Sequence, residues 1–99
     1  MDITHRLQDV EFEWDEDKAK SNIQKHDVTF EEAAEVFFDP FYQIGDASVD
    51  DDEERDFIIG YTFSQRLLLA VHTEHDERTR IISARPATRI ERKLYEERI

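Results

Sequence analysis

The sequence predicts an α+β fold, with helices packed on a largely antiparallel sheet. Three helix-start signals indicate the helices, two near the N-terminus and one near the C-terminus. Between them, apolar side chains alternate over short stretches that polar turns separate, which is typical of strands. Only two Gly and two Pro occur, and 38% of the residues are hydrophobic, so the chain is not of the disordered class. The length of 99 residues suits a single domain over residues 1–99, with one modest core.

The first quarter of the chain predicts a lead-in, a strand and a helix. Residues 1–9 are expected to form a loose polar lead-in. Residues 10–14 alternate apolar and glutamate side chains, which is the period of a short strand with one buried face. Asp15 can cap a helix of about ten residues that extends through Lys25. Asp27 is expected to end this helix because aspartate tolerates left-handed backbone geometry.

This first helix is expected to be amphipathic. Its inner face would carry Ala19 and Ile23. Lys18, Asn22 and Lys25 share a neighbouring stripe at helical spacing. We expect Lys25 to be exposed, either as a phosphate contact or as a solvated charge.

A second helix and four strands follow. Thr29 and Glu32 form a capping box that begins a helix over residues 30–38. Pro40 ends that helix. The remaining pattern predicts four strands joined as an antiparallel meander, over residues 41–44, 55–63, 66–74 and 79–85.

The last helix begins at a second capping box, formed by Thr88 and Glu91, and runs toward Ile99. The predicted order is therefore a short N-terminal strand, two helices, a four-stranded antiparallel meander and one C-terminal helix. An acidic run from Asp50 to Glu54 precedes the second strand of the meander.

The net charge of −12 is unevenly distributed along the chain. Residues 1–54 hold 18 acidic and 4 basic residues, a net of −14, whereas residues 55–99 hold 7 acidic and 9 basic residues, a net of +2. Arginines gather between residues 78 and 92, and this cationic segment needs either a carboxylate partner within the protein or an external anion. The overall acidity argues against tight, non-specific binding to nucleic acid.

Several classes of site and location are excluded. The chain has no cysteine, which excludes disulfides, thiolate metal sites and a cysteine nucleophile. No apolar run reaches membrane-spanning length, and the N-terminus lacks the pattern of a signal peptide, so we expect a soluble, cytoplasmic protein without membrane contact. His72 and His75 suggest a metal pair only superficially, because strand alternation sends them to opposite faces. No metal or other cofactor is predicted.

From Phe12 to Tyr95, the chain resembles the BrnT family of toxins from type II toxin–antitoxin modules. The matching stretches are FEWDEDKAKSNIQKH, TFEEAAEVFFDP, EERDFIIGYT and RIISARPATRIERKLYEE, in this order. The resemblance implies a RelE-like ribonuclease fold, cleavage of RNA without a metal, and neutralisation by a small DNA-binding antitoxin, BrnA. The protein would then meet DNA only indirectly, through the antitoxin complex. Asp27 departs from the family pattern, which usually has glycine after the Lys-His pair.

Metal-free RNA cleavage requires activation of a ribose 2′-hydroxyl, stabilisation of the phosphorane and protonation of the leaving oxygen. The arginines would hold and stabilise phosphate, while the histidines would move protons. The predicted catalytic residues are His26, Arg55, His72, Arg80 and Arg85, and the predicted RNA-binding residues are Lys25 and Arg89.

Each catalytic candidate also has a purely structural interpretation. Arg80 and Arg85 lie five residues apart on one strand and are predicted to project to opposite faces, so one could serve the substrate while the other pairs with a carboxylate. His72 could be a core histidine, and His26 a favourable charge at a helix C-terminus. Arg55 could form a loop salt bridge of little energetic weight.

A second hypothesis is a non-catalytic partner-binding module that docks an acidic protein on its arginine-rich surface. The acidic balance of the chain motivates this alternative. Growth arrest on expression without the partner, relieved by arginine substitutions, would distinguish the toxin from the binding module.

Overall fold

The computed structural model of this protein describes residues 1–48 and 53–97. The strands are β1 (Asp2–Leu7), β2 (Val10–Asp15), β3 (Gln43–Asp46), β4 (Asp56–Tyr61), β5 (Leu67–His75) and β6 (Arg78–Pro86). The helices are α1 (Glu16–His26), α2 (Phe30–Glu35), the single 3-10 turn η1 (Val36–Phe38) and α3 (Arg89–Glu97). Within the predicted acidic run, residues 50–52 lie outside the described residues, as does the predicted helix end at Ile99.

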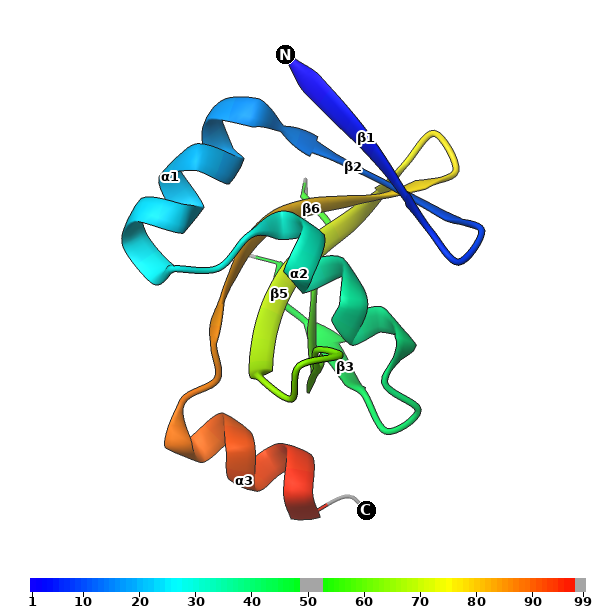
Figure 1. Cartoon of the computed structure of the whole chain (residues 1–99). Coiled ribbons are helices and arrows are strands. Elements are labelled where there is room, and N and C mark those ends of the chain that lie inside the picture. The colour runs from blue at the N-terminus through cyan, green and yellow to red at the C-terminus, as the bar shows by residue number, and fades with distance from the viewer. Residues whose placement is uncertain (49–52, 98–99) are drawn as a thin grey trace.

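The strands form one six-stranded sheet in the order β1-β2-β6-β5-β4-β3 (Figure 1). The predicted meander is present as β3 to β6, in which each neighbouring pair is antiparallel. The sheet is nevertheless larger than four strands, and it is mixed because β2 lies parallel to β6. The α+β class is therefore correct, whereas the four-stranded sheet is a wrong prediction.

The N-terminal segment forms β1, so the predicted loose lead-in is also wrong. β1 pairs with β2 along its whole length, with Ile3 opposite Trp14. Gln8 and Asp9 adopt φ values of 48° and 67°, as a two-residue type I′ turn requires. Exposed and partly buried side chains alternate along this strand. Its exposed positions carry aspartate, threonine and arginine, so the sequence of the strand resembles that of a polar tail.

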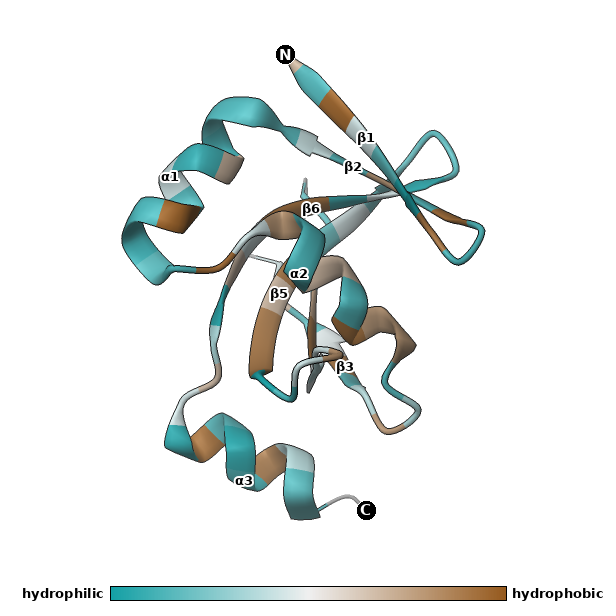
Figure 2. Ribbon diagram, viewed as in Figure 1, coloured by the Kyte–Doolittle hydropathy of each residue, from teal (hydrophilic) through white to brown (hydrophobic). Residues whose placement is uncertain are grey.

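Two apolar clusters lie on the two faces of the sheet, and apolar residues follow β5 between them (Figure 2). On one face, α1, α2 and η1 pack over the larger core, whose buried members include Phe12, Trp14, Phe30, Ile58, Leu68 and Ile81. On the other face, Tyr95 of α3 packs with Ile59, Leu67 and Leu69 at one end of the strands. The opposite end of this second face is polar. Arg80 lies at that polar end, opposite Thr73 of β5.

The first helix buries a different residue from the one predicted. Ile23 is 45% exposed, whereas Asn22 is buried. The Asn22 Nδ2 donates to the carbonyl oxygen of Val28 at 2.9 Å, and its Oδ1 accepts from the amide of Ala84 at 3.1 Å. Asn22 thereby fixes α1 to the following turn and to β6, which an apolar side chain could not do.

The predicted helix signals are confirmed. Asp15 accepts a hydrogen bond from the Lys18 amide at 3.0 Å, and Thr29 accepts one from the Glu32 amide at 3.0 Å. Asp27 ends α1 in the left-handed region with φ 55° and ψ 40°. An aspartate therefore takes the left-handed position that follows the last turn of α1. No helix in residues 1–48 or 53–97 is long and apolar enough to cross a membrane.

A β-bulge shifts the register of β6 against β5. Val71 lies opposite Ser83, but the next residue, His72, lies opposite Ile81, so Ile82 is the extra residue. The bulge reverses the alternation of side chains along the second half of β6.

The bulge places Arg80 and Arg85 on the same face of the sheet. Arg80 lies opposite Thr73 and Arg85 opposite Leu69, and these two partners are four residues apart on β5. The prediction that the two arginines face opposite sides is therefore wrong. It assumed an uninterrupted strand, and a single inserted residue is enough to overturn it.

Candidate functional site

Two neighbouring hollows lie where α1 meets the polar end of the sheet, and together they form the basic groove. The first has a volume of about 250 Å³ and is lined by Lys18, Ser21, Asn22, Lys25, His26, Ile82 and Ser83. The second has a volume of about 350 Å³ and is lined by Lys18, Glu53, Glu54, Arg55, Thr73, Arg80 and Ile82. Lys18 and Ile82 belong to both hollows, so the groove is continuous along β6.

The first hollow is cationic. Lys18 and Lys25 are exposed and lie seven residues apart on α1, so two helical turns bring them to one side of the helix. Neither ammonium group has an ion-pair partner within residues 1–48 and 53–97. His26, the last residue of α1, is half-buried beside them. No carboxylate lines this hollow, so its surface favours an anion.

The second hollow has charges of both signs. Arg55 donates from Nη2 to Glu53 Oε1 at 3.0 Å, which matches the loop salt bridge considered for it. The Thr73 hydroxyl donates to the carbonyl oxygen of Glu54 at 2.9 Å and ties this loop to β5. Arg55 therefore reaches the groove from a loop that the sheet holds in place.

Arg80 is fixed by two carboxylates from the N-terminal strands. Its Nη1 donates to Asp2 Oδ2 at 3.1 Å and to Glu13 Oε2 at 2.5 Å, and its Nη2 donates to Asp2 Oδ1 at 3.1 Å. These hydrogen bonds hold the pKa of Asp2 below its usual range and raise the pKa of Arg80. The guanidinium is thus permanently charged and oriented, while its Nε has no partner among the described residues.

Glu13 and His75 are two polar residues that sequence reasoning did not select; they line neither hollow, but Glu13 joins His75 to Arg80. Glu13 is buried, with 3% of its surface exposed, and its Oε2 lies 2.9 Å from Nδ1 of His75. Arg78 approaches the other oxygen of Glu13, with Nη1 3.9 Å from Oε1. The pairing of β2 with β6 places Glu13 opposite Arg80. Because these residues lie 67 positions apart, only an expected β2–β6 pairing could have indicated the contact.

His72 lies on the other face of the sheet. Its ring packs edge-on against Phe37 with 4.9 Å between the ring centroids, and the side chain is buried. Neither ring nitrogen has a hydrogen-bond partner among the described residues. Burial lowers the pKa of His72, which keeps the imidazole neutral. The predicted divergence of His72 and His75 is confirmed, and the sheet separates His72 from the basic groove.

Arg85 and Arg89 lie toward α3 and line neither hollow of the groove. Arg85 donates from Nη1 and Nη2 to the two carboxylate oxygens of Glu91, at 2.7 and 2.8 Å. Arg89 is exposed at the first residue of α3. The predicted set therefore divides: Lys25, His26, Arg55 and Arg80 share the groove, whereas Arg85, Arg89 and His72 lie elsewhere.

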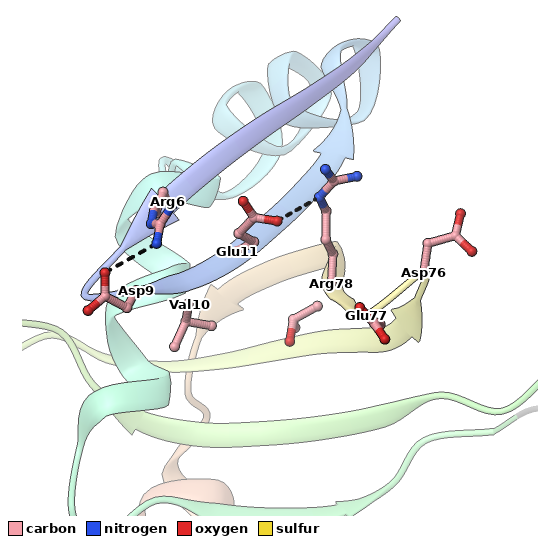
Figure 3. Close-up of a pocket in the computed structure, with 8 residues that line it drawn as sticks. Arg6, Asp9, Val10, Glu11, Asp76, Glu77 and Arg78 are labelled. Atoms are coloured by element: carbon pink, nitrogen blue, oxygen red, sulfur yellow. Dashed lines mark hydrogen bonds and ion pairs between the residues drawn. The ribbon is translucent and has the colours of Figure 1, made fainter.

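A larger hollow of about 560 Å³ lies between the β1–β2 and β5–β6 turns (Figure 3). Its arginines are already paired, with Arg6 Nη2 3.3 Å from Asp9 Oδ1 and Arg78 Nε 3.2 Å from Glu11 Oε2. Four carboxylates line it, those of Asp9, Glu11, Asp76 and Glu77. Because acidic groups outnumber two neutralised arginines, this hollow is poorly suited to phosphate despite its size.

Comparison with known proteins gives the family. The family model described as "Ribonuclease toxin, BrnT, of type II toxin-antitoxin system" matches residues 14–91. The chain is also similar to the crystal structure of the Brucella abortus ribonuclease toxin BrnT, with 22% sequence identity and a TM-score of 0.60, over 77% of this chain and 94% of that one. At this identity the likeness shows the fold. No curated protein matches the chain. Because the family model spans well over half of the sequence, this chain belongs to the BrnT family of ribonuclease toxins of type II toxin–antitoxin systems.

Proposed function

We propose that this protein cleaves RNA without a metal ion and that the basic groove is its substrate-binding site. The observation that carries the proposal is the first hollow of the groove. There, Lys18, Lys25 and His26 gather without an acidic lining residue, in a protein whose net charge is −12. A cationic hollow in a strongly acidic protein is the feature expected of a site for a polyanion.

Different residues of the groove would have different roles in binding and cleaving the RNA backbone. Lys18 and Lys25 would neutralise successive phosphates, since their ammonium groups have no carboxylate to displace in the described part of the chain. Arg80 would stabilise the charge that develops on the phosphorane through its Nε, which has no partner among the described residues, and Arg55 would assist from the loop. His26 lines the groove at the end of α1 and is the proton-transfer candidate of the predicted set that lies within it.

The remaining predicted residues receive different roles in this proposal. Arg89, exposed at the start of α3, would contact phosphates beyond the groove. Arg85 would hold α3 through Glu91 rather than bind substrate, and His72 would serve as a core residue. These assignments follow from the neighbours of each side chain.

We further propose that a BrnA-like antitoxin neutralises the protein by covering the groove with acidic side chains. Lys18 and Lys25 of α1 favour such a partner because they are exposed and have no ion-pair partner among the described residues. DNA would be bound only indirectly, by the antitoxin within the complex. The RNA substrate and the antitoxin would both be met in the cytoplasm.

The test is cleavage of a defined, end-labelled RNA by the purified protein in excess chelator, with and without ribosomes. We expect cleavage that leaves a 2′,3′-cyclic phosphate and a 5′-hydroxyl. Lys25→Gln and Arg80→Ala should reduce cleavage, while Lys93→Gln on α3 should not, and circular dichroism should show that all variants are folded. Cleavage that requires added Mg²⁺ would contradict the metal-free mechanism. Unchanged cleavage by both groove variants would contradict the site.

A further inference from the structure

We infer that His75, oriented by the buried carboxylate of Glu13, is the general base of this site. The inference rests on the proposed RNA cleavage and names the residue that accepts the first proton. The phosphate contacts proposed for the groove, and the stabilisation of the phosphorane by Arg80, are unchanged. It places the reacting phosphate at the end of the groove where Arg80 lies.

One oxygen atom joins the two functional groups. Glu13 Oε2 accepts from Arg80 Nη1 at 2.5 Å and lies 2.9 Å from His75 Nδ1. The imidazole therefore lies beside a guanidinium that lines the second hollow. A general base and a phosphate-stabilising cation must both reach the same phosphodiester. The carboxylate that His75 and Arg80 share holds the two side chains next to each other, as this requires.

Glu13 is suited to positioning this histidine. It projects from β2 between Phe12 and Trp14, which are both buried on the opposite face and hold the strand in place. Its side chain is 5% exposed, so His75 and Arg80 take the place of water as its partners. A rigid strand and a desolvated anion give the imidazole a defined orientation.

The hydrogen bond also selects the tautomer. When Nδ1 carries the proton and donates it to the carboxylate, Nε2 of the neutral imidazole is left as a proton acceptor. The His75 side chain is 53% exposed, so substrate can reach it. Asp76 Oδ2 lies 3.6 Å from Nε2, but this carboxylate belongs to a side chain that is 81% exposed on the β5–β6 turn. Substrate can displace it without opening the core; the same turn borders the hollow in Figure 3.

The other histidines considered for this step are less well placed. His72 lies across the sheet, and its two ring nitrogens are buried. His26 lines the first hollow, beside Ser83, whereas Arg80 lines the second. Neither contacts the carboxylate that anchors Arg80 in the structure.

The step balances without a metal or redox partner. The Nε2 of neutral His75 takes the proton of the ribose 2′-hydroxyl as the 2′-oxygen attacks the adjacent phosphorus. Arg80 stabilises the charge on the non-bridging oxygens of the phosphorane. The P–O5′ bond then breaks, and the 5′-oxygen takes a proton from water. The products are a 2′,3′-cyclic phosphate and a 5′-hydroxyl, and the imidazolium returns its proton to solvent.

The test compares His75→Ala, Glu13→Gln and His5→Ala in single-turnover cleavage of a defined RNA at saturating protein. His5 is the matched control because it packs against Trp14, with 5.5 Å between ring centroids, away from the groove. We expect His75→Ala to lower the rate constant by about 100-fold or more, the range of general base catalysis, with little change in RNA affinity. Added imidazole should restore part of the activity of His75→Ala, which a merely structural histidine would not show.

Glu13→Gln should lower the rate constant without lowering RNA affinity in proportion, because the amide keeps the volume but not the charge that orients the imidazole. If this variant fails to fold, the imidazole rescue of His75→Ala still decides the assignment.

If His75→Ala cleaves RNA as fast as the wild type, the inference is overturned and the proposed function stands. No cleavage by the wild type, alone or with ribosomes, would overturn the proposed function and this inference with it. A substrate with a 5′-bridging sulfur needs no proton on its leaving group, so its rapid cleavage by His75→Ala would reassign His75 as the acid and overturn its role as base.

Discussion

The guanidinium of Arg85 and the carboxylate of Glu91 face each other in two parallel hydrogen bonds of 2.7 and 2.8 Å. The same carboxylate accepts from the amide of Thr88 at 2.9 Å, and the Thr88 hydroxyl accepts from the amide of Glu91 at 3.2 Å. Glu91 therefore completes the predicted capping box and also ties the first turn of α3 to β6. One acidic side chain both begins the helix and sets its position on the sheet.

We predict that Glu91→Gln destabilises the fold at neutral pH and much less in acid. The hydrogen bonds from Arg85 hold the pKa of Glu91 below its usual range. A carboxyl with a lowered folded pKa contributes stability that is present above its unfolded pKa and is lost as the pH falls through its folded pKa. The wild type should exceed the variant by about 1 kcal/mol near neutrality, a modest value because both side chains are partly solvated.

The measurement is urea unfolding of both proteins across the acidic range. The difference between their free energies of unfolding should shrink as the pH falls below the ordinary glutamate value. Glu96→Gln, on the exposed part of the same helix, is the control for a general loss of helix charge. A constant difference at every pH would show that Glu91 acts through packing or capping alone.

A second prediction concerns the buried amide of Asn22. Asn22→Leu should lower the free energy of unfolding by about 2–6 kcal/mol, because it leaves two buried backbone groups without partners, each worth about 1–3 kcal/mol. These groups are the carbonyl of Val28 and the amide of Ala84. Asn22→Asp retains an oxygen for Ala84 but loses the donor to Val28, so it separates the two contributions. Gln24→Leu, on the exposed side of α1, is the matched control, and equal losses for Leu at both positions would contradict the bridging role.

Local signals were sufficient for most of the elements in this fold. Asp15, Thr29 and Thr88 each begin a helix where their side chains predicted one, because capping is decided within four residues. The β5–β6 turn also falls between the strands predicted over residues 66–74 and 79–85, with Asp76 and Glu77 at φ 50° and 65°. Predictions of this kind depend only on neighbours in the chain.

The site was harder to predict because its contacts join distant segments. Lys18, Asn22 and Lys25 were recognised as one stripe of α1, but the sequence did not indicate that Asn22 alone turns inward. Arg80 meets Glu13 through a parallel pairing between segments 67 residues apart, and no local pattern encodes that neighbour. The bulge at Ile82 is equally invisible, since the strand reads as continuous in sequence. Long-range pairing and one inserted residue together decided which candidates share a face.

A third prediction uses the salt dependence of RNA binding. Each lysine that neutralises a phosphate of a single strand contributes about 0.7 to the slope of log affinity against log salt. Lys18→Gln and Lys25→Gln should each lower that slope by about this amount, and should weaken binding to different RNA sequences equally. The measurement is fluorescence anisotropy with a non-cleavable 2′-O-methyl RNA at several salt concentrations. Lys93→Gln, on the exposed face of α3, should leave the slope unchanged, and a wild-type slope in the α1 variants would remove these lysines from the site.

A fourth prediction concerns acid stability and the buried imidazole of His72. Burial lowers its pKa in the folded state, so between the folded and the ordinary histidine pKa the unfolded chain binds more protons. This group therefore makes the fold less stable as the pH falls below the ordinary histidine value, about 6.5. His72→Leu should remove that part of the pH dependence. At pH 7 it should be neutral or stabilising by about 1 kcal/mol, because apolar surface against Phe37 replaces two buried nitrogens that have no partner among the described residues. Urea unfolding at pH 7 and at pH 5 measures both effects, with His26→Leu as the comparison for a half-buried histidine at a helix end.

RNA cleavage measured on the same samples should persist in His72→Leu. Loss of cleavage by a folded His72→Leu variant would show that His72 takes part in catalysis, although it lies on the opposite face of the sheet from Arg80.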